Sequence, residues 1–476
     1  MRKQSGKTRN RHGVDEEPEH KRFGERLCCL MKAQNISQKE LAREAKISER
    51  SLRNYLAGRT YPKQSTLTAI AKAMKLTTLE LENPQAFLNV MSSSTVDFQK
   101  LTFEQIYDLL MEVDSYLLSL IRSITLKDHD AIKRGYSDIL TSELLKKGLT
   151  IVGFLNFIHN KDSAARLIST LPSKPSLQIR VGKHFERVDF MREGTVILPI
   201  HGAQLLWDCC CTSRSEPNPH CAIHSHTMGN AVNEMFENGL VEIKWNDMRF
   251  LWRQSRVLWP PSVDSFFFIE SLERAGITTS DVRTVLDIGS GTGFLGIALA
   301  RLKGDMKKVV LSDWLLTPAL FGQLNWQLNA PEGSTTSVIS QVTMHAETLP
   351  PSEALFDLVV CNPPYLPCLT GFDQTGLEST VFGTDLLEYV IQRGKSLGKR
   401  VFVQYSHLAR PEAMRAAKAA GLQLKVIHTR KNVPFRVRHA LARPKYMESL
   451  VRERELRQAV GEGHRYLHDL FTCEVI

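Results

Sequence analysis

The spacing of apolar residues changes several times along the chain, and each change predicts a different kind of element. Residues 1–21 are polar, with Lys and Arg concentrated at the start, which indicates a flexible basic arm. Over 22–82, and again over 83–174, apolar residues recur with helical spacing. We therefore expect a helical domain followed by a helical linker region, in which the apolar pattern at 103–171 serves core packing.

The second half of the chain changes period again. Over 175–257 the spacing shortens towards two, as in SLQIRVGKHFERVDF and TVILPI, which predicts a β-rich region. Over 258–445 apolar strands alternate with helical segments, as expected for βαβ units. The last residues, 446–476, are interpreted as a charged helical tail. The sequence thus predicts a multidomain chain with an all-α N-terminal domain, a mixed middle region and an α/β, Rossmann-like C-terminal domain.

Composition narrows the class of protein. The 476 residues are 42% hydrophobic and 24% charged, which excludes a collagen-like or wholly disordered chain. The net charge of +10 permits a polyanionic partner. No stretch approaches the length of a membrane span, the first residues lack the apolar segment of a secretory signal, and the cysteines are odd in number. We therefore expect a reduced, cytoplasmic protein with no membrane partner.

The segment NISQKELAREAKISERSLRNYLAGRTYPKQ carries the pattern of two short helices joined by a turn. Ser37 is placed to cap the first helix, in a capping box with Glu40. Ser48 is placed to cap the second helix, which Gly58 ends. The outer face near the start of this second helix is left with Glu49, Arg50, Arg53 and Asn54.

Arg and Asn form bidentate hydrogen bonds with guanine and adenine in the major groove. The segment resembles Cro/repressor-type helix-turn-helix domains, with Leu41-Ala42, Ile47-Ser48 and Gly58 in register, although Lys46 stands where that family often has glycine. The resemblance implies DNA binding, usually as a homodimer. A helical bundle used for protein contact is the alternative. The implied DNA-binding residues are Gln38, Ser48, Glu49, Arg50, Arg53 and Asn54.

A second motif lies in VLDIGSGTGFLGIALA. An apolar strand carries Asp287 near its end and runs into Gly289, Gly291 and Gly293, before a helix. Glycines at this spacing let the backbone turn tightly against a ligand. Asp313 ends the next apolar strand, where a carboxylate can accept hydrogen bonds from ribose hydroxyls. A dinucleotide-binding enzyme uses the same parts, so this pattern alone leaves both classes open.

The tetrad Asn362-Pro363-Pro364-Tyr365 follows the apolar strand FDLVV directly. It resembles the catalytic tetrad of class I S-adenosylmethionine-dependent methyltransferases that modify a planar nitrogen. These include adenine-N6 DNA methyltransferases and HemK-like release-factor glutamine methyltransferases. The resemblance implies that fold over 258–445, with S-adenosylmethionine as cofactor and no metal. The implied cofactor-binding residues are Asp287, Gly289, Gly291, Gly293, Asp313 and Glu347.

The residue types of the tetrad suit this chemistry. An exocyclic amine or amide nitrogen is a poor nucleophile because its lone pair is conjugated. The Asn362 side-chain oxygen and the Pro363 carbonyl can accept its two hydrogens, and Tyr365 can stack on the planar group. Methyl transfer is an in-line displacement, so positioning and electrostatics carry most of the catalysis.

The methyl acceptor is less sharply defined by the sequence. Segments around Asp264-Ser265 and Gly383–Leu387 resemble the glutamine methyltransferases. The helix-turn-helix pattern favours DNA, and the basic stretch 425–445 is either a phosphate-binding surface or a solvated edge. We favour N6 of adenine, flipped out of the DNA stack, over a protein glutamine. A transcription regulator that senses S-adenosylmethionine is a third interpretation, which the intact tetrad disfavours.

The middle region contains a cluster of thiols and imidazoles. Such ligands can build a tetrahedral zinc site, but the spacing contains no CxxC pair. We favour buried cysteines and a surface histidine loop, with zinc as the alternative. The cluster consists of Cys209, Cys210, Cys211, His220, Cys221, His224 and His226.

Overall fold

The computed structural model describes the chain in two compact units. One unit comprises residues 1–97 and 138–154, and the other comprises 98–137 and 155–476. The described residues are 23–24, 27–28, 31, 36–74, 81, 96–123, 136, 139–141, 143–144, 147, 149–171, 177–182, 187–192, 195–201, 240–253, 255, 257–343, 355–367, 369, 383–434, 444–458 and 466–476. The predicted basic arm at 1–21 lies outside them. No described helix is long and apolar enough to cross a bilayer.

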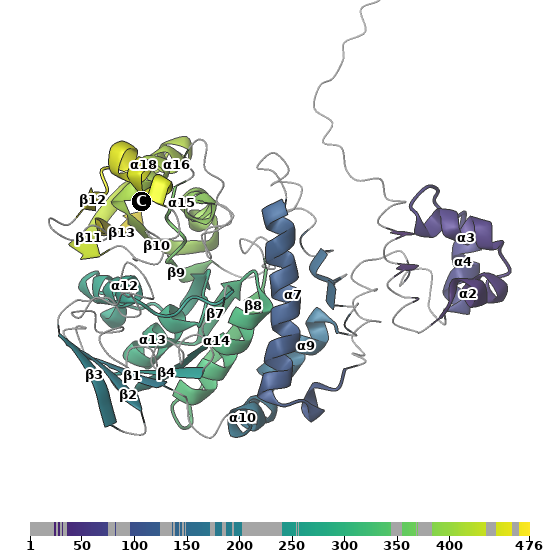
Figure 1. Ribbon diagram of the computed structural model, residues 1–476, viewed down its shortest axis with the longest axis horizontal. Coiled ribbons are helices and arrows are strands. Elements are labelled where there is room, and N and C mark those ends of the chain that lie inside the picture. The colour runs from purple at the N-terminus through teal and green to yellow at the C-terminus, as the bar shows by residue number, and fades with distance from the viewer. Residues whose placement is uncertain are drawn as a thin grey trace, which may run out of the picture. The chain divides into compact units, whose positions relative to one another are not determined.

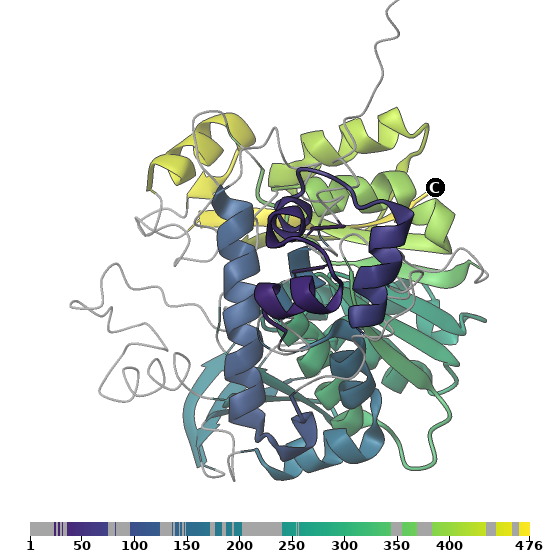
Figure 2. The ribbon, with the colours of Figure 1, turned by 90° about the vertical axis from the view of Figure 1, so that its right-hand side faces the viewer.

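The first unit contains the short helices α2 (Gln38–Glu44), α3 (Glu49–Leu56) and α4 (Gln64–Ala73), drawn in purple in Figures 1 and 2. The Ser37 hydroxyl accepts from the Glu40 amide at 3.2 Å, and the Ser48 hydroxyl accepts from the Ser51 amide at 3.0 Å, so each serine caps its predicted helix. Leu41, Leu52 and Ile70 belong to one buried core. The all-α class predicted for this part of the chain is confirmed.

The turn between α2 and α3 has a left-handed residue. Lys46 has φ +52°, and it stands at the position where the sequence departs from the glycine of the resembled family. A non-glycine residue in this region costs about 1–2 kcal/mol. The Ile47 amide donates to the Ala42 carbonyl at 3.0 Å across the same turn, which helps to fix it.

The second unit is built on a mostly parallel sheet of eight strands. The order is β11-β13-β10-β9-β6-β7-β8, and β12 pairs with β13. The chain runs from β6 outwards through β7 and β8, then returns to β9 on the other side of β6, so the switch point lies between β6 and β9. The strands are β6 (Thr284–Ile288), β7 (Lys308–Asp313), β8 (Ser337–Val342), β9 (Phe356–Cys361), β10 (Gly398–Ser406), β11 (Leu424–Pro434), β12 (Arg457–Gln458) and β13 (Tyr466–Val475).

Helices flank this sheet, as Figure 1 shows. Helices α13 and α14 contact each other and β7, whereas α15 contacts β9, β10 and α16. The central strands are apolar runs because both of their faces are covered. The predicted α/β, Rossmann-like class is confirmed. The helices are α12 (Val263–Arg274), α13 (Phe294–Lys303), α14 (Leu316–Asn329), α15 (Asp385–Leu397), α16 (Arg410–Ala419) and α18 (Pro444–Arg454), with short turns η3 (Ile277–Thr279) and η4 (His407–Ala409).

A smaller sheet lies in the region that was expected to be β-rich, with the order β3-β2-β1-β4-β5. Asn325 of α14 joins it to the large sheet: its amide nitrogen donates to the Leu251 carbonyl at 3.1 Å and to the Thr292 carbonyl at 2.9 Å. Through Asn325, strand β5 of the middle region is therefore linked to Thr292 of the glycine-rich turn. The strands are β1 (Leu177–Val181), β2 (Arg187–Arg192), β3 (Thr195–His201), β4 (Leu240–Trp245) and β5 (Met248–Arg253).

The expected helical linker at 83–174 differs from what the structure shows. Its longest helix, α7 (Phe103–Ser123), packs on α14 within the second unit, with Asp114 fully buried. Helices α9 (Ile151–His159) and α10 (Lys161–Ser169) and the turn η1 (Phe98–Lys100) follow the same apolar pattern. Helix α7 belongs to the second unit and not to a linker because its apolar residues, such as Phe103, Leu110 and Leu117, are buried. This agrees with the prediction that the apolar pattern at 103–171 serves core packing.

The expected helical tail also differs from the structure. Helix α18 covers only its beginning, and Tyr466–Val475 forms strand β13 inside the large sheet, antiparallel to both β10 and β11. The predicted methyltransferase segment, 258–445, therefore lacks two strands of its own sheet, β13 and the short β12 that pairs with it. The residues His468, Leu470 and Thr472 are buried at a spacing of two, a strand pattern too short to stand out beside the charged helix.

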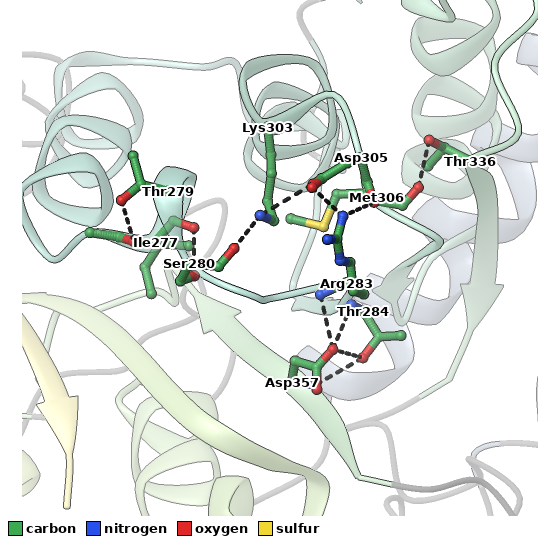
Figure 3. Close-up of polar contacts among 11 residues, drawn as sticks. Ile277, Thr279, Ser280, Arg283, Thr284, Lys303, Asp305, Met306, Thr336 and Asp357 are labelled. Atoms are coloured by element: carbon green, nitrogen blue, oxygen red, sulfur yellow. Dashed lines mark hydrogen bonds and ion pairs between the residues drawn. The ribbon is translucent and has the colours of Figure 1, made fainter.

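The end of the sheet opposite the switch-point loops is fixed by polar contacts, shown in Figure 3. The Asp357 carboxylate accepts from the backbone amides of Arg283 and Thr284 at 2.9 and 3.0 Å. Its partial burial alone would raise its pKa, but these bonds and the Lys399 ammonium outweigh that effect and lower the pKa to about 2. Asp357 thus joins the start of β9 to the start of β6.

Candidate active site

The glycine-rich turn after β6 lies beside the carboxyl end of β7. The amides of Gly289 and Ser290 both donate to the Ser312 carbonyl, at 2.8 and 3.1 Å. Gly289, Gly291 and Gly293 all have positive φ, between 53° and 77°. This conformation favours glycine, so the residue type follows from the turn.

The carboxylate of Asp287 is buried beneath this turn, with 1% of its surface exposed. Its Oδ2 accepts from the Gly296 amide at 2.9 Å, and its Oδ1 is buried without a hydrogen-bond partner among the described residues. Burial raises the pKa of Asp287 to about 7, and the nearby Asp313 adds to the shift. A buried acceptor with spare capacity suits a ligand that brings donors or positive charge.

Asp313 faces the same turn from the end of β7. Its Oδ2 accepts from the Gly291 amide at 2.9 Å, and its Oδ1 accepts from the amides of Trp314 and Leu315 at 2.8 and 3.3 Å. Burial raises the pKa of Asp313 to about 6, although these three bonds oppose the rise. The carboxylate is oriented by backbone and lies between the glycine turn and the start of α14.

Asn362 stands at the corresponding level on the neighbouring strand. Ile288, Cys361 and Val403 are paired across β6, β9 and β10. The next residues, Gly289, Asn362 and Gln404, therefore lie at the same level, where β6 and β9 end and β10 continues to Ser406. The Asn362 Nδ2 donates to the Asp264 carboxylate at 3.0 Å, and its Oδ1 accepts from the Gln404 Nε2 at 3.3 Å. Because a carboxylate only accepts, Asp264 determines which way the Asn362 amide points.

The rest of the tetrad lies between the sheet and α18. Pro363 is buried, while Pro364 and Tyr365 are half-buried. The Tyr365 ring lies 5.8 Å from the ring of His468. After the tetrad, the Pro367 carbonyl accepts from the Tyr446 hydroxyl of α18 at 2.8 Å. The structure therefore brings the predicted tetrad, glycine turn and two aspartates to one edge of the sheet.

The predicted DNA-binding residues lie on α2 and α3 of the first unit. Asn54 is half-buried, and Arg53 donates from Nε to the Glu49 carbonyl at 3.4 Å. Ser48 is already engaged as the cap of α3. The exposed members of the set are Gln38, Ser48, Glu49, Arg50 and Arg53.

Two predicted sites fall outside the described residues: Glu347 and the whole cluster Cys209–His226. Within the described part of the chain, no group of three or more His, Cys, Asp or Glu residues could hold a metal ion.

Three residues near Asn362 and the glycine turn were not predicted from the sequence. Gln404 was passed over within the apolar strand KRVFVQYS, although a single polar residue near the carboxyl end of a buried strand is a usable signal. Thr472 was missed with β13 itself. Leu386, whose Cδ2 would lie 3.1 Å from a Cβ added at Gly289, gave no signal beyond the resembled Gly383–Leu387 segment.

Comparisons with known proteins identify two domains in the chain. A family profile described as helix-turn-helix matches residues 30–81, and one described as methyltransferase small domain matches residues 263–420. No curated protein sequence matches the chain.

Similar solved structures include three methyltransferases. A ribosomal protein L11 methylase from Lactobacillus delbrueckii subsp. bulgaricus has 16% identity and a TM-score of 0.27, over 45% of this chain and 77% of that one. A precorrin-6y C5,15-methyltransferase from Geobacter metallireducens has 11% identity and a TM-score of 0.27, over 44% and 86%. TrmK of M. capricolum, solved with S-adenosyl-homocysteine, has 11% identity and a TM-score of 0.25, over 42% and 66%. Similarities this weak carry no argument about the present chain.

The profile match and the sheet topology define residues 263–420 as a methyltransferase domain. The chain carries this methyltransferase domain together with an N-terminal helix-turn-helix domain. The glycine turn and the spare acceptor of Asp287 fit a positively charged nucleoside cofactor.

Proposed function

We propose that this protein is a DNA-directed methyltransferase that modifies N6 of adenine, bound to DNA as a homodimer. The observation that carries the proposal is the exposed row Glu49, Arg50 and Arg53 on the capped helix α3, in the same chain as a methyltransferase domain. Side chains at the start of such a helix reach base edges in the major groove. In this proposal the helix-turn-helix domain binds DNA and the methyltransferase domain of the same chain methylates it.

In this proposal Asn362 and Pro363 bind the exocyclic nitrogen of an adenine that has left the base stack. The Asn362 Oδ1 accepts one bond from Gln404, and a carbonyl oxygen has a second lone pair for an N–H of the acceptor. The Pro363 carbonyl accepts the other hydrogen, and Tyr365 stacks on the base. These contacts orient the nitrogen and favour its pyramidal form, in which the lone pair is available.

The proposed cofactor-binding set is Asp287, Gly289, Gly291, Gly293, Asp313 and Glu347. When bound, S-adenosylmethionine supplies an electrophilic methyl group on a positively charged sulfur. Asp313 is placed to accept ribose hydroxyls, because backbone amides already hold its carboxylate in one orientation. Asp287 lies buried below the turn and holds the start of α13 by accepting from the Gly296 amide.

Asn362→Ala tests the tetrad. The variant should lose methyl transfer to DNA, by at least about a hundredfold, because a transition-state hydrogen-bond partner is removed. It should retain DNA binding and cofactor binding. The assay follows label from S-adenosylmethionine into duplex DNA, with adenine products separated by mass. Full activity in Asn362→Ala would remove the tetrad from the mechanism.

A second acceptor, a protein glutamine, is favoured by two local contacts. Asp264 bonds directly to Asn362, and Leu386 approaches the glycine turn, and both belong to the segments that resemble glutamine methyltransferases. A glutamine amide offers the same two hydrogens to Asn362 and Pro363. The same labelling assay run with cell protein and with DNA decides between them, because label in protein alone would exclude the DNA proposal.

A further inference from the structure

We propose that Thr472 of β13 is a positioning residue for the catalytic amide, acting on Asn362 through Gln404. This inference rests on the proposed function, because it assumes that the Asn362 Oδ1 receives the acceptor's hydrogen. Thr472 lies outside the matched segment 263–420, on strand β13, which pairs with β10 in the sheet. The register places Gln404 directly opposite Thr472.

The contacts fix the direction of each amide. The Gln404 Nε2 donates to the Asp264 backbone carbonyl at 2.7 Å and to the Asn362 Oδ1 at 3.3 Å. A backbone carbonyl only accepts, so the nitrogen of Gln404 must face Asp264 and its oxygen must face the other way. That oxygen lies 3.1 Å from the Thr472 hydroxyl, which donates to it.

Burial makes each of these bonds hard to replace. Gln404 and Thr472 are both fully buried, with 0% of their surface exposed. The Thr472 hydroxyl is also 3.0 Å from the Ser271 hydroxyl of α12, but it has only one proton to donate. Ser271 already donates to the Phe267 carbonyl at 2.7 Å, whereas the Gln404 oxygen can only accept, so we place the Thr472 proton on Gln404. If Thr472 loses its hydroxyl, the Gln404 oxygen is left without this donor in a place that water does not reach. Gln404 can then turn, and Asn362 loses the neighbour that holds its oxygen in place.

The consequence concerns the rate of the chemical step more than binding of the cofactor. Thr472 bonds to Gln404 and Ser271, whereas Asp287 and Asp313, which bind the cofactor in the proposed function, accept from backbone amides at and after the glycine turn. Asn362 contacts the acceptor nitrogen, whose position relative to the methyl group sets the rate. A positioning role therefore predicts a lower kcat with an unchanged affinity for S-adenosylmethionine.

The test is a set of substitutions in the full chain. Thr472→Val keeps the shape and removes the hydroxyl, and Thr472→Ser keeps the hydroxyl. Cys473→Ala is the matched control. It removes the thiol of a fully buried residue that is next to Thr472 on β13 but is not hydrogen-bonded to Gln404 or Asn362. We expect Thr472→Val to lower kcat for DNA methylation about tenfold, the loss expected for one buried hydrogen bond. Thr472→Ser should recover most of the rate, and Cys473→Ala should keep it.

A double substitution shows whether Thr472 acts through Gln404. In a Gln404→Leu background, Thr472→Val should lower kcat no further, because the residue that transmits its effect is absent. Calorimetric titration with S-adenosylmethionine should give the same Kd for wild type, Thr472→Val and Thr472→Ser. Equal kcat in wild type and Thr472→Val, or a Thr472→Ser variant as slow as Thr472→Val, would overturn the proposal.

A second readout separates this inference from the choice of acceptor. If the wild-type protein transfers no methyl group to DNA, the proposed function fails, and the side-chain amide signals of Asn362 then decide the positioning role. In protein labelled with ¹⁵N-asparagine, these signals are assigned by their absence from Asn362→Ala. Thr472→Val should shift them and speed their hydrogen exchange, and Thr472→Ser should not. Unchanged signals in Thr472→Val would refute the role independently of any acceptor.

Discussion

The glycines of this protein show how one residue type serves two purposes. Gly293 and Gly304 have nearly the same φ, +77° and +75°, and lie at the two ends of α13. A Cβ at Gly293 would lie 2.8 Å from the Leu311 Cδ1 and 3.1 Å from the Gly322 Cα, whereas a Cβ at Gly304 would meet nothing within 4 Å. Backbone conformation alone requires Gly304, and close packing adds a second requirement at Gly293.

This contrast gives a matched pair of substitutions. Gly304→Ala should cost about 1–2 kcal/mol of unfolding free energy, from the left-handed backbone alone. Gly293→Ala should cost about 1–3 kcal/mol more from crowding, and should weaken binding of S-adenosylmethionine because the turn shifts. Urea unfolding and calorimetric titration measure the two effects. An equal loss of unfolding free energy in both variants would show that α13 shifts enough to accommodate the added Cβ at Gly293.

At the residue scale, the sequence indicated where the glycine turn and the tetrad would lie, because few other structures need those residues in that order. The structure places both at one edge of the sheet, and their roles stay predictions. Gln404 escaped because its partners come from α12, β9 and β13, and no local pattern shows that such distant segments meet. Direct evidence for Glu347 must come from cofactor binding by Glu347→Gln.

At the scale of elements, helix α7 supplies the side chain that caps the first turn of α14. The Asp114 carboxylate accepts from the amides of Leu316 and Thr317, at 3.0 and 2.8 Å, at the first turn of α14. These are donors that the helix cannot satisfy itself. The sequence predicted a helix over α7 from its period, but a cap supplied from two hundred residues away leaves no trace in local spacing.

Asp114 also makes stability depend on pH. Burial raises its pKa from 3.8 to about 6, although its hydrogen bonds oppose the rise. The native state therefore holds one more proton than the unfolded state between these values, and this contribution to stability is lost as pH rises through about 6. Relative to Asp114→Asn, the wild type should lose up to about 3 kcal/mol of unfolding free energy between pH 4 and pH 7.

Urea unfolding of the cofactor-free protein across that range measures the difference directly. The Asn variant is the control for every other titrating group, because those groups are common to both proteins. A wild type that gained stability relative to Asp114→Asn as pH rose would show that the carboxyl is ionised throughout.

At the scale of the whole molecule, recognition and chemistry are assigned to separate compact units. Arg50→Ala combined with Asn54→Ala should weaken sequence preference in DNA binding by about 1–3 kcal/mol per lost base contact. Cofactor affinity should stay at the wild-type value, because the methyltransferase unit has its own core. Fluorescence anisotropy with specific and scrambled duplexes measures the first, and calorimetry the second.

A loss of cofactor affinity in that double variant would contradict the division of roles. Sedimentation of the wild type with and without DNA tests the homodimer in the same samples, and a monomer under both conditions would exclude it. The sequence anticipated the two functional units because each carries its motif within one continuous segment. It did not anticipate that 98–137 joins the second unit, which is a matter of long-range packing.

The position of β13 has a consequence for how the enzyme is made. Strands β10 and β11 do not pair with each other, and the strand that separates them is synthesised after both. While that strand is still inside the ribosome, a nascent chain presents two unpaired edges, which invite wrong partners. The contacts from Thr472 to Gln404 and from Gln404 to Asn362 likewise cannot form until translation has passed Thr472.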